Sequence, residues 1–408
     1  MSLTLRETCR GCGGVLEPFL FLGDQPLANR LRKPGEEGAQ ATYPLTLCRC
    51  RECDLVQLRE VVDPALLFAD YAYVPSTSST MRAHFDELAG SITERFSLGP
   101  HHLVVDVGSN DGLLLSCFQR RGVRVLGIEP AENLAQRATA NGIPTRSAFF
   151  GAEVARELSQ ESPAAVVTAT NVFAHVDDVR AFLRAAFTLL APDGVFVVEV
   201  QSLADTVSSL AFDMTYHEHM TYYATAPLQS LCEREGLALL DIERVDTHGG
   251  SLRAVIGRRG HPQARPARVA ERIADERGRA GAAGCQRLAL GAAAVREQLR
   301  TLLGDIRRRG GRVAAYGAPA KATVLLNYCE LSGTDVEYVV DRNPAKQGQR
   351  IPGADIPVVG AEHLDAHPPT HLLLLAWNLA EEIMSEQESY RAGGGHFVVP
   401  VPVPRVVG

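Results

Sequence analysis

The chain has 408 residues, of which 46% are hydrophobic and 22% are charged, and its formal net charge is -7 at pH 7. This composition is typical of a folded protein with two or three domains and excludes collagen-like, coiled-coil and largely disordered chains. The negative balance gives no general attraction to nucleic acids or anionic lipids. We therefore expect no nucleic-acid or membrane partner and a monomer or dimer. Residues 1–10 lack the apolar stretch of a signal peptide, which predicts a cytoplasmic location.

Five of the nine cysteines fall within the first 53 residues. Two pairs with the Cys-x2-Cys spacing, Cys9 with Cys12 and Cys50 with Cys53, can place four thiolates around one tetrahedral Zn2+. Cys48 also offers a pairing with Cys50, but the x2 spacing of Cys50 and Cys53 repeats that of the first pair. Four thiolates close the metal to substrate, so its role would be structural. The alternative is a set of reduced cysteines without metal.

After this segment the sequence alternates apolar strands, glycine turns and amphipathic helices. Such an alternation is typical of a mostly parallel sheet with helices on its faces. Strands are predicted at 103–107, 123–128, 165–168 and 195–200, and helices at 113–121, 133–141 and 179–190.

Alanine and arginine dominate residues 262–309, which we interpret as exposed helices that connect two bodies. A second α/β pattern follows, with a first strand at 312–316. The sequence therefore predicts an α/β fold in four parts. These are a zinc-binding module (1–72), a central Rossmann-like domain (73–260), a helical connector (261–308) and a C-terminal Rossmann-like domain (309–408).

The loop after the first strand of the central domain reads Gly-Ser-Asn-Asp-Gly at 108–112. Its glycines let the backbone approach a ligand at a helix N-terminus. A dinucleotide fingerprint would be G-x-G-x-x-G, and the G-x-N-x-G order found here favours S-adenosylmethionine (SAM) instead. Glu129 can accept the ribose hydroxyl protons, and Asn171 lies where SAM enzymes line the amino-acid end of the cofactor. The alternative for the loop alone is a tight turn. The predicted cofactor-binding residues are Gly108, Asn110, Asp111, Gly112, Glu129 and Asn171.

Residues 212–223 are dense in proton-handling groups. His219 is the candidate base for removing a proton next to a ketone, and His217 is a reserve, because alternate positions of an extended segment share one face. Glu218 could orient or polarise a neighbour, and Tyr216 could donate to a developing oxyanion. The alternative is a group of solvated or packed side chains.

Other polar and aromatic residues are expected at the same sheet edge. His175, in Thr-Asn-Val-Phe-Ala-His at 170–175, and His248, in His-Gly-Gly-Ser at 248–251, are two of them. Tyr71 and Tyr73 could bring aromatic hydroxyls from the N-terminal module as a lid, although such tyrosines more often only pack. Tyr222 is a further candidate.

Together these motifs resemble the SAM-dependent sugar C-methyltransferases of antibiotic deoxysugar biosynthesis. The likeness runs nearly end to end and departs from the family at His217 and Cys48. It rests on the two cysteine pairs and on these motifs: Leu-Gly-Asp-Gln-Pro-Leu at 22–27, Asn-Asp-Gly at 110–112, Tyr-His-Glu-His at 216–219, His-Gly-Gly at 248–250, Tyr-Gly-Ala at 316–318 with Lys321, and Ala-Trp-Asn at 376–378. By resemblance, Tyr216, Glu218 and His219 serve the proton abstraction with His175 nearby.

The resemblance also implies a substrate and a reaction. His219 would deprotonate C3 of a thymidine-diphosphate (dTDP) linked 4-keto-(2,6-di)deoxyhexose, and that carbon would take the methyl group of SAM, giving a branched, mycarose-like sugar of an antibiotic. The C-terminal domain would help to hold the nucleotide sugar. The predicted substrate-binding residues are Tyr71, Tyr73, Tyr222, His248, Lys321 and Asn343, of which Lys321 and Asn343 are expected to contact the nucleotide sugar at its diphosphate.

Two other classes of function compete with this one. NADPH-dependent 4-ketoreduction of the same sugar is suggested by the 316–318 turn and Asp341, but a turn with one glycine supplies a poor pyrophosphate cradle, which argues against NADPH. A binding module for protein or RNA is the third reading. The acidic balance and the dense 212–223 segment argue against it.

Overall fold

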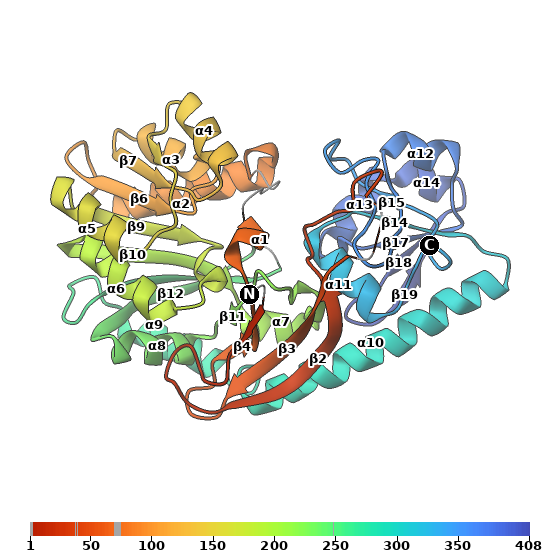
Figure 1. Cartoon of the computed structure of the whole chain (residues 1–408), viewed down its shortest axis with the longest axis horizontal. Helices are drawn as coiled ribbons and strands as arrows, with labels where there is room; N and C mark the ends of the chain where they lie inside the picture. The colour runs from red at the N-terminus through yellow and green to blue at the C-terminus, as the bar shows by residue number, and fades with distance from the viewer. Residues whose placement is uncertain (1–2, 37, 39, 69–74, 248) are drawn as a thin grey trace.

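The computed structural model describes residues 3–36, 38, 40–68, 75–247 and 249–408. Three of the predicted substrate-binding residues, Tyr71, Tyr73 and His248, lie outside the described residues. The chain forms an N-terminal module, a central domain with a seven-stranded sheet and a C-terminal domain with a six-stranded sheet (Figure 1).

The N-terminal module is built on an antiparallel sheet with the strand order β11-β4-β3-β2. Three of its strands are β2 (Leu16–Pro26), β3 (Thr42–Cys50) and β4 (Val56–Leu58). The fourth, β11 (Thr221–Tyr222), belongs to the later part of the central domain's sequence and pairs with β4. A second small sheet pairs β1 (Leu3–Leu5) with β5 (Glu60–Val62), and α1 (Pro64–Phe68) follows.

The central sheet has the order β12-β13-β10-β9-β6-β7-β8, in which β10, β9, β6, β7 and β8 are parallel and β13 is antiparallel to both of its neighbours, β10 and β12. The four strands predicted from the sequence are all present. The strands are β6 (Leu103–Val107), β7 (Arg124–Ile128), β8 (Thr145–Arg146), β9 (Ala164–Thr170), β10 (Leu190–Gln201), β12 (Leu237–Val245) and β13 (Ser251–Arg258).

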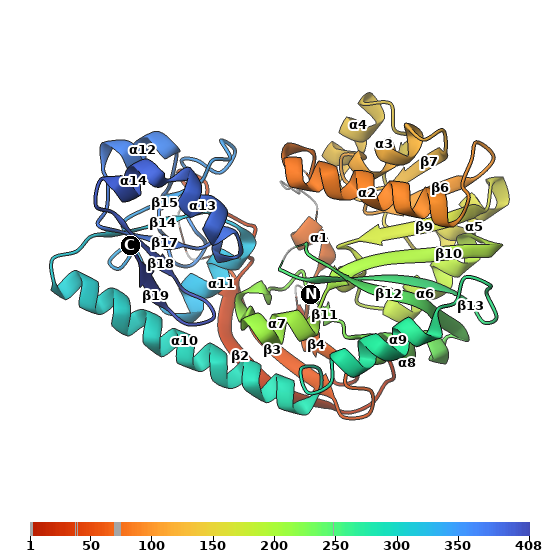
Figure 2. The same ribbon diagram turned by 180° about the vertical axis from the view of Figure 1, so that it is seen from behind.

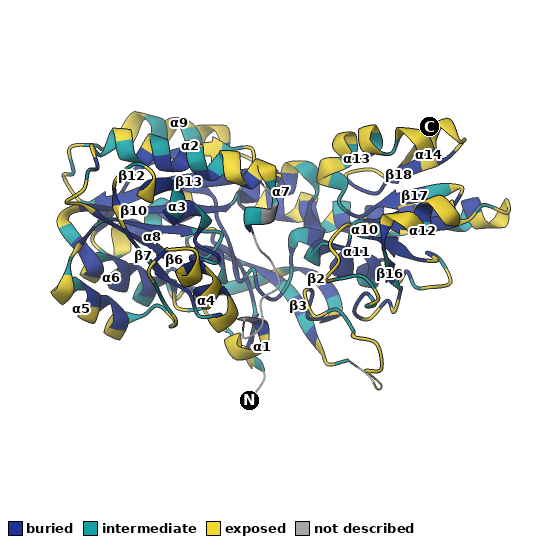
Figure 3. Cartoon of the chain, turned by 90° about the horizontal axis from the view of Figure 1, so that it is seen from above, coloured by how far each residue is buried: buried dark blue, intermediate teal, exposed yellow. Residues whose placement is uncertain are grey.

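Helices cover both faces of this sheet because successive strand residues point to opposite sides. Val104 and Val197 pack with α2, α3 and α4, whereas Val105 and Val198 pack with α5, α6, α8 and α9. Figure 3 shows the buried strands between helices with exposed outer faces. The helices are α2 (Ser79–Arg95), α3 (Leu113–Gln119), α4 (Glu132–Ala140), α5 (Ala152–Glu161), α6 (Val179–Leu189), α8 (Thr225–Arg234) and α9 (Pro266–Asp275).

The C-terminal domain is a second Rossmann-like unit with the strand order β16-β15-β14-β17-β18-β19, in which only β19 is antiparallel to its neighbour. Its strands are β14 (Val313–Tyr316), β15 (Val339–Val340), β16 (Val358–Val359), β17 (His371–Leu374), β18 (His396–Val399) and β19 (Arg405–Val407). Its helices are α11 (Ala320–Tyr328), α12 (Ala361–Ala366), α13 (Ala380–Glu386) and α14 (Glu388–Ala392).

The long helix α10 (Ala282–Arg308) runs beneath the N-terminal sheet and along the C-terminal domain (Figures 1 and 2). The prediction of a solvated connector is wrong for its inner face, since Leu288, Val295 and Leu299 are buried in one core with β2, α7 (Leu203–Ser209) and the C-terminal domain. The buried positions recur at helical spacing, which the alanine-rich composition obscured. Among the helices of the described ranges, none combines the length and the apolarity needed to cross a bilayer.

Candidate active site

The four cysteines of the two predicted pairs form one group in the N-terminal module. Their sulfur atoms all lie within 4.8 Å of one another, with 3.6 Å between Cys9 and Cys53 and 3.4 Å between Cys12 and Cys50. Sulfur atoms around a tetrahedral zinc are separated by ~3.8 Å, given a Zn–S bond of about 2.3 Å. The donor set therefore fits a closed structural zinc site.

Backbone amides also point at these sulfur atoms, as expected for thiolates held by tight turns. Gly11 donates to Cys9 at 3.3 Å, and Gly14 donates to Cys12 at 3.3 Å. Cys48 lies outside the group and is fully buried, and burial raises the pKa of its thiol to about 11. Its thiol therefore stays protonated and packs as an apolar group.

The 108–112 loop lies at the carboxyl end of β6, where open parallel sheets bind ligands. Gly108 has a φ of +66°, and a Cβ there would lie 2.4 Å from a methyl carbon of Val172. A side chain at this position would be strained in this backbone conformation and would also clash with Val172. In the part of the chain that the structure describes, Ser109 Oγ and Asp111 Oδ1 are buried without hydrogen-bond partners, which fits a loop that binds a polar ligand.

Glu129 follows β7 and holds this loop in place. Its carboxylate accepts hydrogen bonds from the backbone N–H groups of Asn110 (2.8 Å) and Ala131 (2.9 Å). Burial raises the pKa of Glu129, while these two amides favour its ionised form. Asn171 follows β9 with a φ of +57°, and its N–H donates to the Glu199 carbonyl at 2.8 Å. The predicted cofactor residues thus follow three adjacent strands of the sheet.

The segment that holds the predicted catalytic residues is a turn after the 3-10 helix Phe212–Met214. His219 Nδ1 lies 2.9 Å from the Met214 carbonyl oxygen. A carbonyl oxygen only accepts hydrogen bonds, so Nδ1 carries the proton and the lone pair of the neutral imidazole is on Nε2. This tautomer is the one that a base acting through Nε2 requires.

Aromatic rings surround His219 on several sides. The ring centroids of Tyr216 and His175 lie 3.9 Å and 5.2 Å away, and that of Tyr222 lies 6.4 Å away. His175 belongs to the 3-10 helix Phe173–His175, whose Ala174 carbonyl accepts the Met220 N–H at 2.8 Å. Desolvation lowers the pKa of His175 to about 4, so its imidazole is neutral at neutral pH.

Glu218 is only 3% exposed, and burial raises the pKa of its carboxyl to about 7. The Nδ2 amide of Asn29 donates to both of its oxygens, at 2.9 Å and 2.7 Å. The sequence analysis missed Asn29. The available signal was its position, two residues after the 22–27 motif.

His217 does not share a face with His219, and this prediction was wrong because the segment is a turn, not an extended strand. The His217 ring packs against Tyr43 with 5.8 Å between centroids, and His217 Nε2 donates to the Pro44 carbonyl at 3.0 Å. Desolvation lowers the pKa of His217. The structure therefore places His217 against the N-terminal module.

Lys321 lies in a buried cluster between the C-terminal domain and the catalytic turn. Its Nζ donates to Asn378 Oδ1 at 2.5 Å and lies 3.9 Å from the Trp377 ring centroid. The Trp377 indole donates to Asp213 at 2.7 Å. Desolvation lowers the pKa of Lys321 to about 8, and the Asp213 carboxylate opposes that shift.

The two other described candidates for substrate binding lie in different surroundings. Tyr222 is buried, and its hydroxyl lies 3.5 Å from the Met214 carbonyl oxygen. Asn343 is exposed, and its backbone N–H donates to Asp341 at 2.8 Å. The other Asp341 oxygen accepts from the Ala318 N–H at 2.7 Å, so this carboxylate holds the 316–318 turn.

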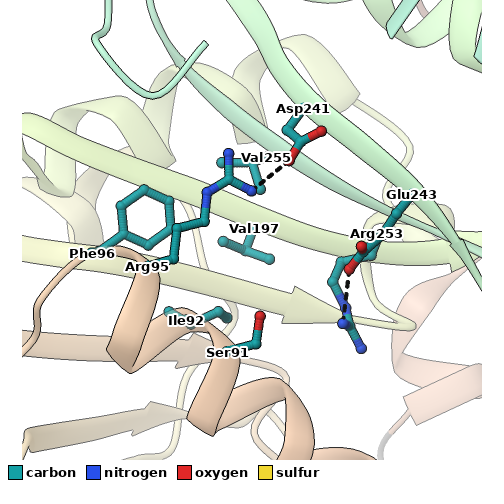
Figure 4. Close-up of a pocket in the computed structure, with 9 residues that line it drawn as sticks. All are labelled: Ser91, Ile92, Arg95, Phe96, Val197, Asp241, Glu243, Arg253 and Val255. Carbon is teal, nitrogen blue, oxygen red and sulfur yellow. Dashed lines mark hydrogen bonds and ion pairs between the residues drawn. The ribbon is translucent and has the colours of Figure 1, made fainter. Parts of the chain in front are cut away.

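A small pocket lies away from these residues, between α2 and strands β10, β12 and β13 (Figure 4). Its charged groups are already paired. Arg95 contacts Asp241 at 2.6 Å, and Arg253 contacts Glu243 at 3.0 Å. None of the predicted catalytic residues lines it, so it is not part of the candidate site.

Three family models match successive parts of the chain. They are described as "Putative zinc binding domain" (residues 9–68), "Methyltransferase domain" (81–242) and "C-methyltransferase C-terminal domain" (246–402). The C-methyltransferase NovU of Streptomyces niveus is 38% identical over 409 residues, which cover 98% of this chain and 97% of that protein.

Two further matches cover only part of the chain. A ubiquinone biosynthesis O-methyltransferase of Neisseria meningitidis serogroup C is 29% identical, over 36% of this chain and 67% of that protein. The SAH-bound structure of magnesium protoporphyrin IX methyltransferase (ChlM) from Synechocystis PCC 6803 is 14% identical, with a TM-score of 0.36 over 46% of this chain and 90% of that chain.

The matched domains, the loop at the carboxyl ends of the strands and the four-cysteine group define a SAM-dependent methyltransferase with an N-terminal zinc-binding domain. Because the similarity to NovU spans nearly the whole of both chains, the protein belongs to the C-methyltransferase family. The comparisons thus confirm the family resemblance that the sequence motifs carried.

Proposed function

We propose that this C-methyltransferase acts on C3 of a dTDP-4-keto-(2,6-di)deoxyhexose and so makes a branched, mycarose-like deoxysugar of an antibiotic. The observation that carries the proposal is the state of His219. Its Nδ1–H is anchored on the Met214 carbonyl, and its ring packs against those of Tyr216 and His175. A carbon next to a ketone needs such an oriented base before it can attack a methyl group.

Each residue of the turn has a distinct part in this reaction. His219 Nε2 accepts the C3 proton, and the electron pair of the C–H bond moves toward the C4 ketone oxygen. The Tyr216 hydroxyl donates a hydrogen bond to that oxygen. An ionised Glu218, next to His219 in the chain, offsets the positive charge that the imidazole gains. A well-placed base of this kind contributes ~10²–10⁴-fold to a rate.

SAM, when bound, supplies an electrophilic methyl group on its sulfonium. The residues proposed to hold it follow β6, β7 and β9 and are Gly108, Asn110, Asp111, Gly112, Glu129 and Asn171. Alignment of two bound reactants in such a site can contribute ~7–11 kcal/mol to the lowering of a barrier.

Lys321, Asn343 and Tyr222 remain the described candidates for holding the nucleotide sugar. The Tyr222 ring lies 6.4 Å from the His219 ring, centroid to centroid, and this proximity to the proposed base supports a role for Tyr222 in holding the sugar. The Lys321 ammonium already donates to Asn378. Binding of a diphosphate by Lys321 would therefore exchange this contact for a charged one.

A mass measurement tests the proposed function. Wild type and His219→Ala are incubated with SAM and a dTDP-4-keto-2,6-dideoxyhexose, with and without NADPH. We expect the wild-type product to gain one methyl group without NADPH and the variant to give none. Methylation by the variant would refute His219 as the base. If the product is instead reduced, and forms only with NADPH, the proposal is refuted and 4-ketoreduction is the activity.

A further inference from the structure

The carboxyl of Glu218 is held by a residue of a different domain. Asn29 lies in an exposed turn after β2, 189 residues away in sequence, and its amide donates to both Glu218 oxygens. In the described ranges, Asn29 is the one side chain that donates to this carboxylate. A single amide bridging both oxygens fixes the plane of the carboxyl group as well as its position.

A buried carboxyl group needs such a partner, because an unsatisfied polar group away from water is costly. Burial alone favours the neutral form of Glu218, and the Asn29 amide is the group that opposes it. None of the described charged side chains contributes to the pKa of Glu218. Asn29 therefore controls both the orientation and the charge of this carboxyl.

The rest of the N-terminal module also contacts the turn that carries Glu218, and these contacts fix the position of Asn29 relative to Glu218. The strand β11, which directly continues the turn, pairs with β4 of the module. The Leu58 N–H donates to the Met220 carbonyl at 2.9 Å, and His217 Nε2 donates to the Pro44 carbonyl at 3.0 Å. These contacts hold the turn on both sides of Glu218.

The cysteine group is linked to the site as well. Arg10 lies between Cys9 and Cys12, and its guanidinium donates to the Leu58 carbonyl at 2.5 Å. The same guanidinium contacts Asp177 at 3.1 Å, two residues after His175. The module thus reaches both segments that carry the candidate catalytic residues.

We propose that Asn29 is a positioning residue, which fixes the Glu218 carboxyl within the turn that carries His219 and so gives the N-terminal module a part in catalysis. The inference rests on the proposed function, in which Glu218 supports the base. It predicts that Asn29 governs the turnover number and its pH dependence, and leaves the binding of SAM unchanged.

The test compares Asn29→Ala and Asn29→Asp with the control Gln25→Ala. Gln25 lies in the same module, and its buried amide donates to a backbone carbonyl, that of Leu22, at 2.7 Å. Loss of a hydrogen bond to a charged group predicts a fall in kcat of about 10- to 100-fold for Asn29→Ala. Asn29→Asp keeps the shape but puts a second carboxylate against Glu218, so the acid limb of its pH profile should move to higher pH by ~1 unit or more.

A double-mutant cycle separates positioning from general damage. In a Glu218→Gln background the Asn29→Ala substitution should have little further effect on kcat, because the carboxylate that Asn29 orients and helps to ionise is then absent. SAM affinity by calorimetry should stay within about twofold of wild type in all variants. A wild-type pH profile and kcat in both Asn29 variants would overturn the proposal, and so would full additivity in the cycle.

Failure of the proposed function has a different signature. If the wild type methylated no dTDP-4-keto sugar, the Glu218 carboxyl could still be titrated by 13C NMR of glutamate-labelled protein, with Glu218→Gln to assign the signal. Asn29→Ala should then raise the Glu218 pKa, as the positioning role requires. An unchanged Glu218 pKa would overturn that role whatever the substrate.

Discussion

Removal of one zinc ligand should release the metal, whereas removal of the neighbouring Cys48 should not. Structural zinc sites of small modules bind with ~10–16 kcal/mol, or about 2.5–4 kcal/mol for each of four ligands. Cys12→Ser should therefore weaken zinc binding by ~100- to 1,000-fold. Cys48→Ala is the matched control, since Cys48 is buried but lies outside the group of four sulfur atoms.

The assay is zinc content after competition with a chelator. We expect wild type and Cys48→Ala to retain one equivalent and Cys12→Ser to lose it. The loss should reach the active site as well, because Cys50 ends β3 and the next strand, β4, pairs with β11. Zinc retained by Cys12→Ser, or lost equally by Cys48→Ala, would refute the assigned ligands.

Three further predictions concern the active site. Burial raises the pKa of Glu218 from 4.5 to about 7, so its contribution to stability is complete below pH 4.5 and is lost as the pH rises through 7. Urea unfolding at pH 5 and pH 8 should show about 2.5 kcal/mol of this loss in wild type and none of it in Glu218→Gln. Gly108→Ala should lower SAM affinity at least ~10-fold in calorimetry, and a second Val172→Ala change should restore only part of it, since the φ of +66° stays strained. Lys321→Met should cost about 3 kcal/mol of stability in urea, and adding Asp213→Asn should recover much of it because no buried charge is then left unpaired.

Local patterns in the sequence predicted the order of domains, the central strands and the cysteine group. Strand 103–107 and the G-x-N-x-G loop, for example, are specified by neighbouring residues alone, because an apolar run followed by glycines leaves the backbone few alternatives. Spacing alone also favoured Cys53 over Cys48, and the sulfur distances agree with that choice.

Features that depend on contacts distant in sequence escaped the sequence analysis. The donor to Glu218 is Asn29, 189 residues away, and no local pattern links the two. Alternation along an extended segment predicts His217 and His219 on one face, but the backbone turns at these residues, and the His217 ring packs against Tyr43. The strand β11 is only two residues long, and it is a strand only because it pairs with β4.

Hydrogen exchange at C3 of the sugar tests the central claim most directly. The enzyme is incubated in deuterated water with the dTDP-4-keto sugar and S-adenosylhomocysteine, so that deprotonation proceeds without a methyl donor. We predict deuterium at C3 with wild type and a rate at least ~100-fold lower with His219→Ala, at unchanged S-adenosylhomocysteine affinity. Equal exchange in the two proteins would contradict the role of His219 as the base.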